Sequence, residues 1–314
     1  MRLSRLLVVG SLNMDMVVSV PAIPKVGETL LGRNLQKHPG GKGANQAYAA
    51  ASLGGNVSMI GAVGKDEHGV TLLDSLKSAG VDVSGVKQVD CNTGLAIIYV
   101  DNNSQNCIVV LQGANNYVDE EYIDELESYI KDTEWIILQM EIPQKTVEYV
   151  IRKGAELNKK ILLNPAPAPE SFPEELYKMI DIITPNEVEL ESLTGLPAKT
   201  REQIIEVAKV LNKKGVKQVI VTCGDKGAIL VNGENAVHFP APEVKAVDTT
   251  AAGDTFTAAV AVALSEGKTI NEAIVFANCS ASISVTRPGA QSSIPSRREV
   301  EEMFGDMSRK KLDA

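Results

Sequence analysis

The chain has 314 residues, enough for one large domain or two small ones. Hydrophobic residues make up 44% of it and charged residues 23%, which is typical of a soluble globular protein. The net charge of −9, the pI near 5.1 and the aromatic content of only 4% argue against a general nucleic-acid binder or a membrane-surface protein. We therefore expect neither nucleic acid nor membrane among its partners.

The cysteines are widely separated and form no C-x-x-C pair, so the sequence predicts no Cys/His metal site. Separate, reduced thiols suit the cytosol, and we expect a cytoplasmic protein. The apolar run at residues 6–9 is too short for a signal peptide or a membrane span and is typical of a buried strand.

Two polar side chains follow this first strand. Asn13 and Asp15 alternate with apolar neighbours ahead of a predicted strand at residues 16–20, so both should lie on one face. A carboxylate accepts two hydroxyl donors and an amide both donates and accepts, which suits the binding of a sugar. A pair of side chains that caps a loop is an equally good interpretation.

A glycine-rich loop at residues 39–47 leads into a predicted helix at residues 46–53. Three glycines and Lys42 before a helix indicate a phosphate loop. The loop is not a Walker A motif, because Gly43 and not Ser or Thr follows Lys42. A tight turn that lets the chain pass close to a neighbour would explain the glycines equally well.

Residues 93–100 and 106–112 predict a β-hairpin with its turn at residues 101–104. Antiparallel strands do not fit a purely parallel sheet. With predicted strands at residues 16–20 and 30–36 they could form a small separate sheet, or they could extend the main one.

From residue 118 onward, predicted helices alternate with predicted strands. The helices fall at residues 119–131, 146–157, 174–179 and 201–214, and the strands at residues 135–139, 161–163, 180–184 and 218–222. This pattern predicts a doubly wound, mostly parallel α/β sheet, in which ligands collect beyond the carboxyl ends of the strands. Polar residues at such ends are Glu141, Asn164, Asn186, Thr222 and Asp254. Glu141 and Asn186 could instead cap the helices that follow them.

Residues 248–254 end a polar loop before a strongly predicted, Ala-rich helix at residues 255–266. Small residues here leave backbone N–H groups open, and with the helix dipole they favour an anion site. Asp254 would repel a phosphate but could take a proton from a hydroxyl that attacks the phosphorus. The alternative is that Asp254 only caps the helix.

The segment Asp248-Thr-Thr-Ala-Ala-Gly-Asp254, followed by Ala258-Ala259, resembles the C-terminal signature of the ribokinase-like (PfkB) carbohydrate kinases. The loop at residues 39–47 resembles their N-terminal signature, G-G-x-G-x-N, although many members carry Gly where this chain has Ala251. The resemblance implies one α/β domain over residues 1–314, with a doubly wound, mostly parallel central sheet flanked by helices. It also implies a small four-stranded β lid inserted at about residues 14–38 and 92–113, through which many members form homodimers.

The resemblance further implies ATP-dependent phosphorylation of D-ribose at its 5-hydroxyl. Asp254 matches the general base, and the anion hole matches Ala251, Ala252 and Gly253. The sugar-binding positions match Asn13, Met14, Asp15, Gly41, Lys42, Gly43, Ala44, Asn45, Glu141 and Asp254. The nucleotide positions match Asn186, Glu189, Thr222, Cys223, Gly224, Asp225, Lys226, Gly227, Gly253, Asp254 and Asn278, with Glu189 also organising Mg²⁺. A K⁺ site matches Asp248, Thr250, Ser284, Arg287, Gly289 and Ser293.

Two alternatives remain open at the level of sequence. The acceptor could be another small sugar or a nucleoside, such as deoxyribose, fructose or adenosine. The chain could also be a non-catalytic sugar-binding protein on the same scaffold, although the presence of Asp254 in a small-residue loop argues against this. A dinucleotide-dependent dehydrogenase is disfavoured, because residues 10–15 lack the second and third glycines of the fingerprint.

Overall fold

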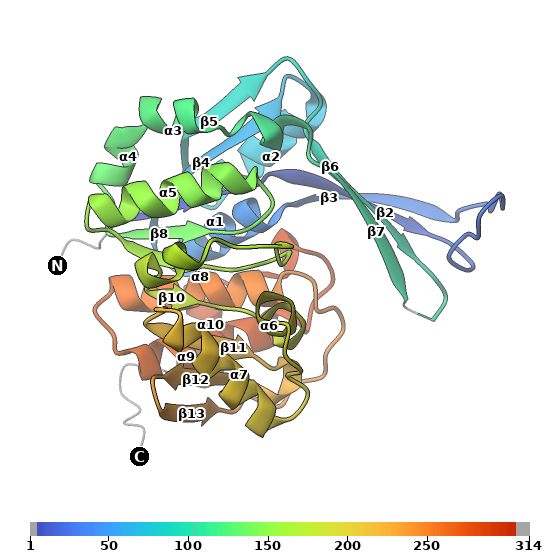
Figure 1. Cartoon of the computed structure of the whole chain (residues 1–314). Helices are drawn as coiled ribbons and strands as arrows, with labels where there is room; N and C mark the ends of the chain where they lie inside the picture. The colour runs from blue at the N-terminus through green and yellow to red at the C-terminus, as the bar shows by residue number, and fades with distance from the viewer. Residues whose placement is uncertain (1–4, 104, 306–314) are drawn as a thin grey trace.

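The structure is a computed structural model that describes residues 5–103 and 105–305 (Figure 1). Within these ranges the larger of two sheets has nine strands. In spatial order they are β13 (Asn235–Phe239), β12 (Ala228–Asn232), β11 (Gln218–Thr222), β10 (Ile182–Ile183), β9 (Lys160–Leu163), β8 (Trp135–Leu138), β1 (Arg5–Val9), β4 (Asn56–Gly64) and β5 (Asp82–Val89). The neighbours from β11 to β5 are parallel, whereas β12 and β13 add an antiparallel edge.

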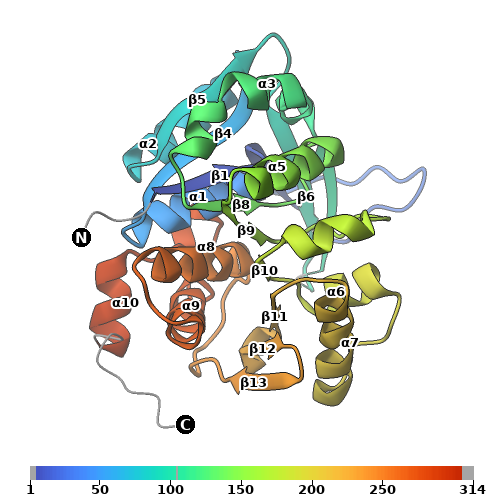
Figure 2. The same ribbon diagram turned by 60° about the vertical axis from the view of Figure 1, so that its left-hand side comes forward.

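Helices cover both faces of this sheet, which is why residues 6–9 of β1 are an unbroken apolar run. Leu6 and Val8 pack into one core and Leu7 and Val9 into the other, as strand alternation requires. The first core is covered by α1 (Lys42–Ser52), α2 (Glu67–Ser78), α8 (Ala252–Ser265), α9 (Ile270–Ser284) and α10 (Arg297–Phe304). The second is covered by α3 (Glu120–Glu125), α4 (Glu127–Lys131), α5 (Gln144–Glu156), the 3₁₀ helix η2 (Glu174–Met179), α6 (Glu187–Thr194) and α7 (Arg201–Lys213) (Figure 2). The predicted doubly wound α/β fold is confirmed.

The second sheet has four strands and projects from the body of the molecule (Figure 1). Its order is β3 (Asn34–Gly40), β2 (Asn13–Ser19), β6 (Gly94–Val100) and β7 (Asn106–Leu111). β2 and β6 are parallel, and the other pairs are antiparallel. The predicted hairpin therefore belongs to a separate sheet and does not extend the main one. The strand predicted at residues 30–36 was misplaced, because β3 is an exposed strand whose polar sequence carries no clear alternation.

Several predicted helices differ from the structure. The helix predicted at residues 119–131 is divided at Leu126, whose backbone (φ −104°, ψ 20°) leaves the helical region. The sequence hides this break, since the apolar spacing of Ile123, Leu126 and Ile130 continues across it. Residues 174–179 form a 3₁₀ helix, which is common for so short a segment. The helix predicted from residue 46 begins at Lys42.

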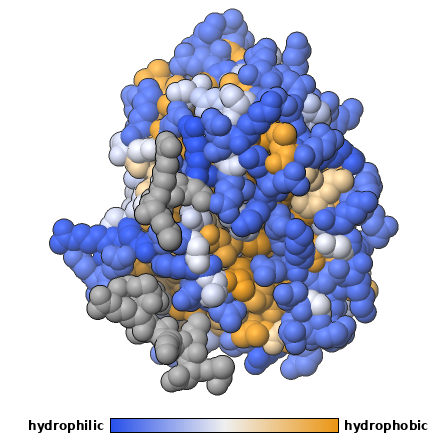
Figure 3. All heavy atoms as spheres, turned by 90° about the vertical axis from the view of Figure 1, so that its left-hand side faces the viewer, coloured by the Kyte–Doolittle hydropathy of each residue, from blue (hydrophilic) through white to orange (hydrophobic). Residues whose placement is uncertain are grey.

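The hydropathy of the surface agrees with a fold whose apolar side chains pack mainly into the two cores. The face turned away from the four-stranded sheet is mostly hydrophilic, with hydrophobic side chains gathered in its lower half (Figure 3). Of the helices in residues 5–103 and 105–305, none combines the length and the apolar character needed to cross a bilayer.

Candidate active site

Asp254 lies in the first turn of α8 and is only 6% exposed. Its Oδ2 accepts a hydrogen bond from Asn45 Nδ2, and its Oδ1 accepts one from Gln46 Nε2, both at 3.0 Å. The N-cap of α8 is Ala251, with no side-chain cap, and the helix begins at Ala252. The interpretation of Asp254 as a helix cap is therefore wrong, because its carboxylate reaches across to α1.

The amino end of α8 offers open backbone donors. Within the described ranges, the N–H groups of Ala251 and Gly253 make no backbone hydrogen bond, whereas Ala252 N–H donates to Thr249 O at 3.3 Å. A Cβ added at Gly253 would meet no atom within 4 Å, so open space lies beside these donors. Free N–H groups at the positive end of a helix suit an anion. Two of the three predicted anion-hole amides are thus available without rearrangement.

Glu141 connects several segments at the end of β8. Its Oε2 accepts hydrogen bonds from Ser11 Oγ at 2.6 Å, Lys42 N at 3.0 Å and Asn13 Nδ2 at 3.4 Å. Asn13 Oδ1 in turn accepts one from Asn115 Nδ2 at 2.8 Å. A carboxylate at the first N–H of α1 is favoured by the helix dipole. Sequence reasoning missed Ser11 and Asn115, which are ordinary polar residues without any motif around them.

Asp15 is a partly buried acid on β2. Burial, followed by the charges of Glu141 and Asp254, raises its pKa to about 7, and Lys42 offsets only part of this. A Cβ added at Gly40 would lie 2.2 Å from Asp15 Oδ2, so the carboxylate occupies space that only glycine leaves free. Asp15 therefore exists in both protonation states near neutral pH.

Lys42 supplies the positive charge of this cluster. Burial disfavours its ammonium, but nearby carboxylates outweigh burial and raise its pKa; in order of influence they are those of Asp254, Glu141, Glu189 and Asp15. Lys42 is therefore protonated and positively charged at neutral pH. Its interactions show that the predicted base, sugar-binding acids and Mg²⁺-organising acid share one electrostatic site.

Asn45 carries an unpaired polar atom. Its Nδ2 donates to Asp254, while its Oδ1 is buried and has no hydrogen-bond partner among the described residues. A buried acceptor without a donor is costly. The hydroxyl of a ligand bound beside Asp254 would supply the missing donor.

The glycine-rich loop also has a structural task. Gly41 is the N-cap of α1 with a φ of 89°, and a Cβ there would lie 2.6 Å from Asn13 N. Ser11 accepts hydrogen bonds from Gly43 N and Ala44 N, at 3.3 and 2.8 Å, through its Oγ and O. The loop is thus a tight turn pressed against the chain after β1, and it places Lys42 and Asn45 in the cluster.

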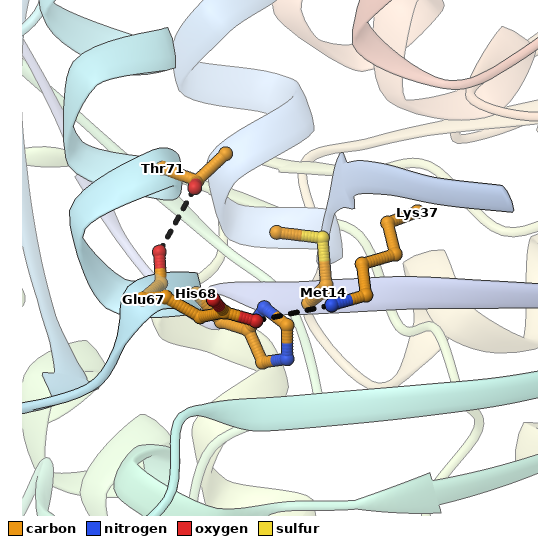
Figure 4. Close-up of a pocket in the computed structure, with 5 residues that line it drawn as sticks. All are labelled: Met14, Lys37, Glu67, His68 and Thr71. Carbon is orange, nitrogen blue, oxygen red and sulfur yellow. Dashed lines mark hydrogen bonds and ion pairs between the residues drawn. The ribbon is translucent and has the colours of Figure 1, made fainter.

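Met14 lies apart from the other predicted sugar-binding side chains. It points to the opposite face of β2 from Asn13 and Asp15 and lines a pocket of about 250 Å³ (Figure 4). The rest of this pocket comes from Lys37, Glu67, His68 and Thr71. An ion pair between Lys37 Nζ and Glu67 Oε1 at 3.1 Å joins β3 to α2 across it. Only the backbone atoms of Met14 could therefore belong to the predicted sugar site.

Asn186 and Glu189 form a capping box at the start of α6. Asn186 Oδ1 accepts from Glu189 N at 2.8 Å, and Glu189 Oε2 accepts from Asn186 N at 2.9 Å. The capping role of Asn186 is confirmed. Burial raises the pKa of Glu189, while the Asn186 N–H and Lys42 act in the opposite direction. Thr222 lies beside Asn186 in a parallel bridge, so the structure brings these three predicted nucleotide residues together.

The turn after Thr222 joins β11 to β12 as an antiparallel hairpin. Its residues Cys223, Gly224, Asp225, Lys226 and Gly227 include the short 3₁₀ helix η3 (Gly224–Lys226). Asn278 of α9 donates through Nδ2 to Phe239 O at 2.9 Å, and a Cβ at Gly227 would meet the same oxygen at 2.1 Å. Asn278 and the turn therefore approach the end of β13 together, with the Asn278 amide already engaged.

Half of the predicted K⁺ residues converge through their polar groups. Asp248 Oδ1 accepts from Thr250 N and Oγ1 at 2.9 and 2.7 Å, and its Oδ2 accepts from Gly289 N at 2.8 Å. These hydrogen bonds outweigh burial and lower the pKa of Asp248. The side chains of the remaining three interact elsewhere: Ser284 with Ala281 O, Ser293 with Ala290 O, and Arg287 with Glu299. Across the described chain, no three His, Cys, Asp or Glu side chains are grouped to hold a metal ion.

Comparison with known proteins identifies the scaffold on which this site is built. A family model described as pfkB family carbohydrate kinase matches residues 3–297. The chain belongs to this family. A ribokinase of Haemophilus influenzae is 42% identical over 300 residues, covering 95% of this chain and 98% of the relative. A deoxyribokinase of Salmonella typhi is 38% identical over 296 residues, covering 94% and 97%.

The structure of an Arabidopsis thaliana ribokinase complexed with ribose and ATP superposes with a TM-score of 0.89 at 36% identity, covering 98% of this chain and all (100%) of that one. The predicted ribokinase-like fold is confirmed. In this pfkB family carbohydrate kinase, the polar cluster lies at the carboxyl ends of the parallel strands, where ligands collect in such folds.

Proposed function

We propose that this pfkB family kinase transfers the terminal phosphoryl group of ATP to the 5-hydroxyl of D-ribose. The observation that carries the proposal is the placement of Asp254. It is a buried carboxylate held by two side-chain amides of α1, beside open N–H groups at the start of α8. The near-full-length similarity to ribokinases, one of them bound to ribose and ATP, supports this choice of substrates.

In this mechanism the sugar lies between α1 and the four-stranded sheet. Asp15 and Glu141 accept hydrogen bonds from sugar hydroxyls, and Asn45 Oδ1 accepts a hydrogen bond from a further hydroxyl. Asp254 removes the proton of the 5-hydroxyl as the oxygen attacks the terminal phosphorus. The N–H groups of Ala251 and Gly253 stabilise the charge that develops on the transferred group.

The nucleotide would lie along the ends of β10 and β11, near Asn186, Thr222 and the turn at residues 223–227. Glu189, whose partly buried carboxylate interacts with Lys42, fits a role in orienting Mg²⁺ and its waters. When bound, Mg²⁺ neutralises phosphate charge. Oxygen atoms of Asp248, Thr250 and Gly289 would contribute to a K⁺ site, because K⁺ prefers oxygen ligands.

The four-stranded sheet would act as the lid and the dimer surface. β7 leaves Ile108, Val109, Val110 and Leu111 each 46–52% exposed. Adjacent apolar residues on an open strand favour association with a second copy. Closure over the sugar would also exclude water, which otherwise competes as acceptor for the phosphoryl group.

A coupled ADP-release assay tests the proposal. It would compare D-ribose, 2-deoxyribose, fructose and adenosine, each with and without K⁺. We expect the highest kcat/KM with D-ribose and stimulation by K⁺. Faster turnover of 2-deoxyribose would instead identify this sugar as the preferred acceptor, as in a deoxyribokinase. ADP release that none of these acceptors accelerates would contradict the kinase mechanism.

A further inference from the structure

A buried chain of side-chain amides ends at Asp254. Gln139, directly after β8, donates through Nε2 to Gln46 Oε1 at 2.6 Å. Gln46 donates through Nε2 to Asp254 Oδ1 at 3.0 Å and to Asn164 Oδ1 at 3.2 Å. Both glutamines are fully buried. The proposed ligand contacts assign no role to Gln46 or Gln139.

The chemistry of the partners determines which way these amides face. If the Gln46 amide were reversed, its oxygen would face the carboxylate of Asp254 and Asn164 Oδ1, which are both acceptors. Gln46 must therefore present its NH₂ to Asp254 and its oxygen to Gln139. Gln139 must then present its own NH₂, which leaves its Oε1 buried and without a partner among the described residues. An unpaired buried acceptor is uncommon and calls for an explanation.

We propose that Gln46, oriented by Gln139, is a positioning residue that fixes the carboxylate of Asp254 for proton removal. This inference rests on the proposed kinase function. In residues 5–103 and 105–305, the side-chain donors to Asp254 are Asn45 and Gln46, one to each oxygen. Asn45 also carries a buried acceptor, Oδ1, that no described protein group satisfies, whereas the hydrogen bonds of Gln46 all go to protein side chains. Gln46 therefore serves the orientation of the base and does not bind the sugar.

Two substitutions separate positioning from packing. Gln46→Met keeps a similar volume and removes both donors. It should lower kcat by about 10²-fold at every pH while the sugar KM changes less than about twofold, because only the geometry of attack is disturbed. Gln46→Glu places a second carboxylate against Asp254. Its activity relative to the wild type should rise as the pH falls from 8 to 6, because the introduced carboxyl group, once protonated, can again donate to Asp254.

A matched control is Asn212→Asp, the same amide-to-acid change in α7. Asn212 donates through Nδ2 to Val216 O at 2.9 Å and takes no part in the proposed chemistry. This variant should lose stability, yet its kcat relative to the wild type should not vary with pH. Melting curves of all variants would restrict the comparison to temperatures at which each is folded.

The inference is overturned if Gln46→Met retains kcat within twofold, or if the relative activity of Gln46→Glu is flat between pH 6 and 8. These results differ from a failure of the kinase proposal, in which the wild type itself phosphorylates no sugar. In that case a crystal structure of Gln46→Met still decides the point. A displaced or rotated Asp254 carboxylate supports positioning, and an unchanged one refutes it.

Discussion

Asp15 should make sugar binding depend on pH close to neutrality. Its pKa of about 7 results first from burial and then from the charges of Glu141 and Asp254. With that pKa, about 9% of Asp15 is ionised at pH 6 and about 91% at pH 8. If the ionised form accepts the sugar hydroxyls, the affinity should fall about tenfold from pH 8 to pH 6, or about 1.4 kcal/mol. At pH 7, binding should release about half a proton per site, because the ligand selects the ionised half of the molecules.

Isothermal titration of the nucleotide-free protein with D-ribose at pH 6, 7 and 8 would measure this affinity. Repeating the pH 7 titration in buffers of different ionisation enthalpy gives the proton release. Asp15→Asn is the matched control: it should bind weakly and with little pH dependence, since the titrating group is gone. An affinity that stays within twofold from pH 6 to pH 8 in the wild type would refute the reasoning.

Three further predictions concern the loop before α8, the exposed strand β7 and the proposed cation site. Ala251 has a left-handed backbone (φ 59°), a conformation that costs an alanine about 1–2 kcal/mol. Glycine avoids this cost but loses about 0.5–1 kcal/mol more conformational entropy on folding. Ala251→Gly should therefore raise the free energy of unfolding by about 0.5–1 kcal/mol. The neighbouring helical Ala252→Gly should lower it by a similar amount, and denaturant melts that rank the two variants the other way would contradict this. Ile108→Lys, at a residue of β7 that is 52% exposed, should convert the proposed dimer to a monomer in sedimentation velocity. A dimer as stable in the variant as in the wild type would exclude this surface. Asp248→Ala should raise the K⁺ concentration for half-maximal activity several-fold, and an unchanged K⁺ dependence would remove Asp248 from the proposed cation site.

The order of elements was predictable because its signals are local. Alternating helices and apolar strands gave the parallel sheet, and the turn at residues 101–104 indicated the hairpin of β6 and β7. Helix starts were harder to predict. Gly41 begins α1 through its positive φ, and Ala251 begins α8 in a conformation that its residue type disfavours. Both helices therefore start several residues before the positions expected from composition.

The residues of the site divide in the same way. Asp254 and Asn45 could be found because they stand in motifs, and Glu141 because it follows a buried strand. Ser11, Asn115 and Gln139 could not, since their roles arise from hydrogen bonds between segments up to 130 residues apart in the chain. Conversely, Met14 fits the motif, but strand alternation directs its side chain into a different pocket.

The central claim is that Asp254 removes the proton of the accepting hydroxyl. Asp254→Asn keeps the size of the side chain and removes its basicity, so single-turnover and steady-state rates with D-ribose and ATP test the claim directly. We expect kcat to fall by about 10²–10⁴-fold, with the ATP dissociation constant, measured separately by calorimetry, unchanged within about twofold. Turnover close to that of the wild type would contradict the assignment of the base.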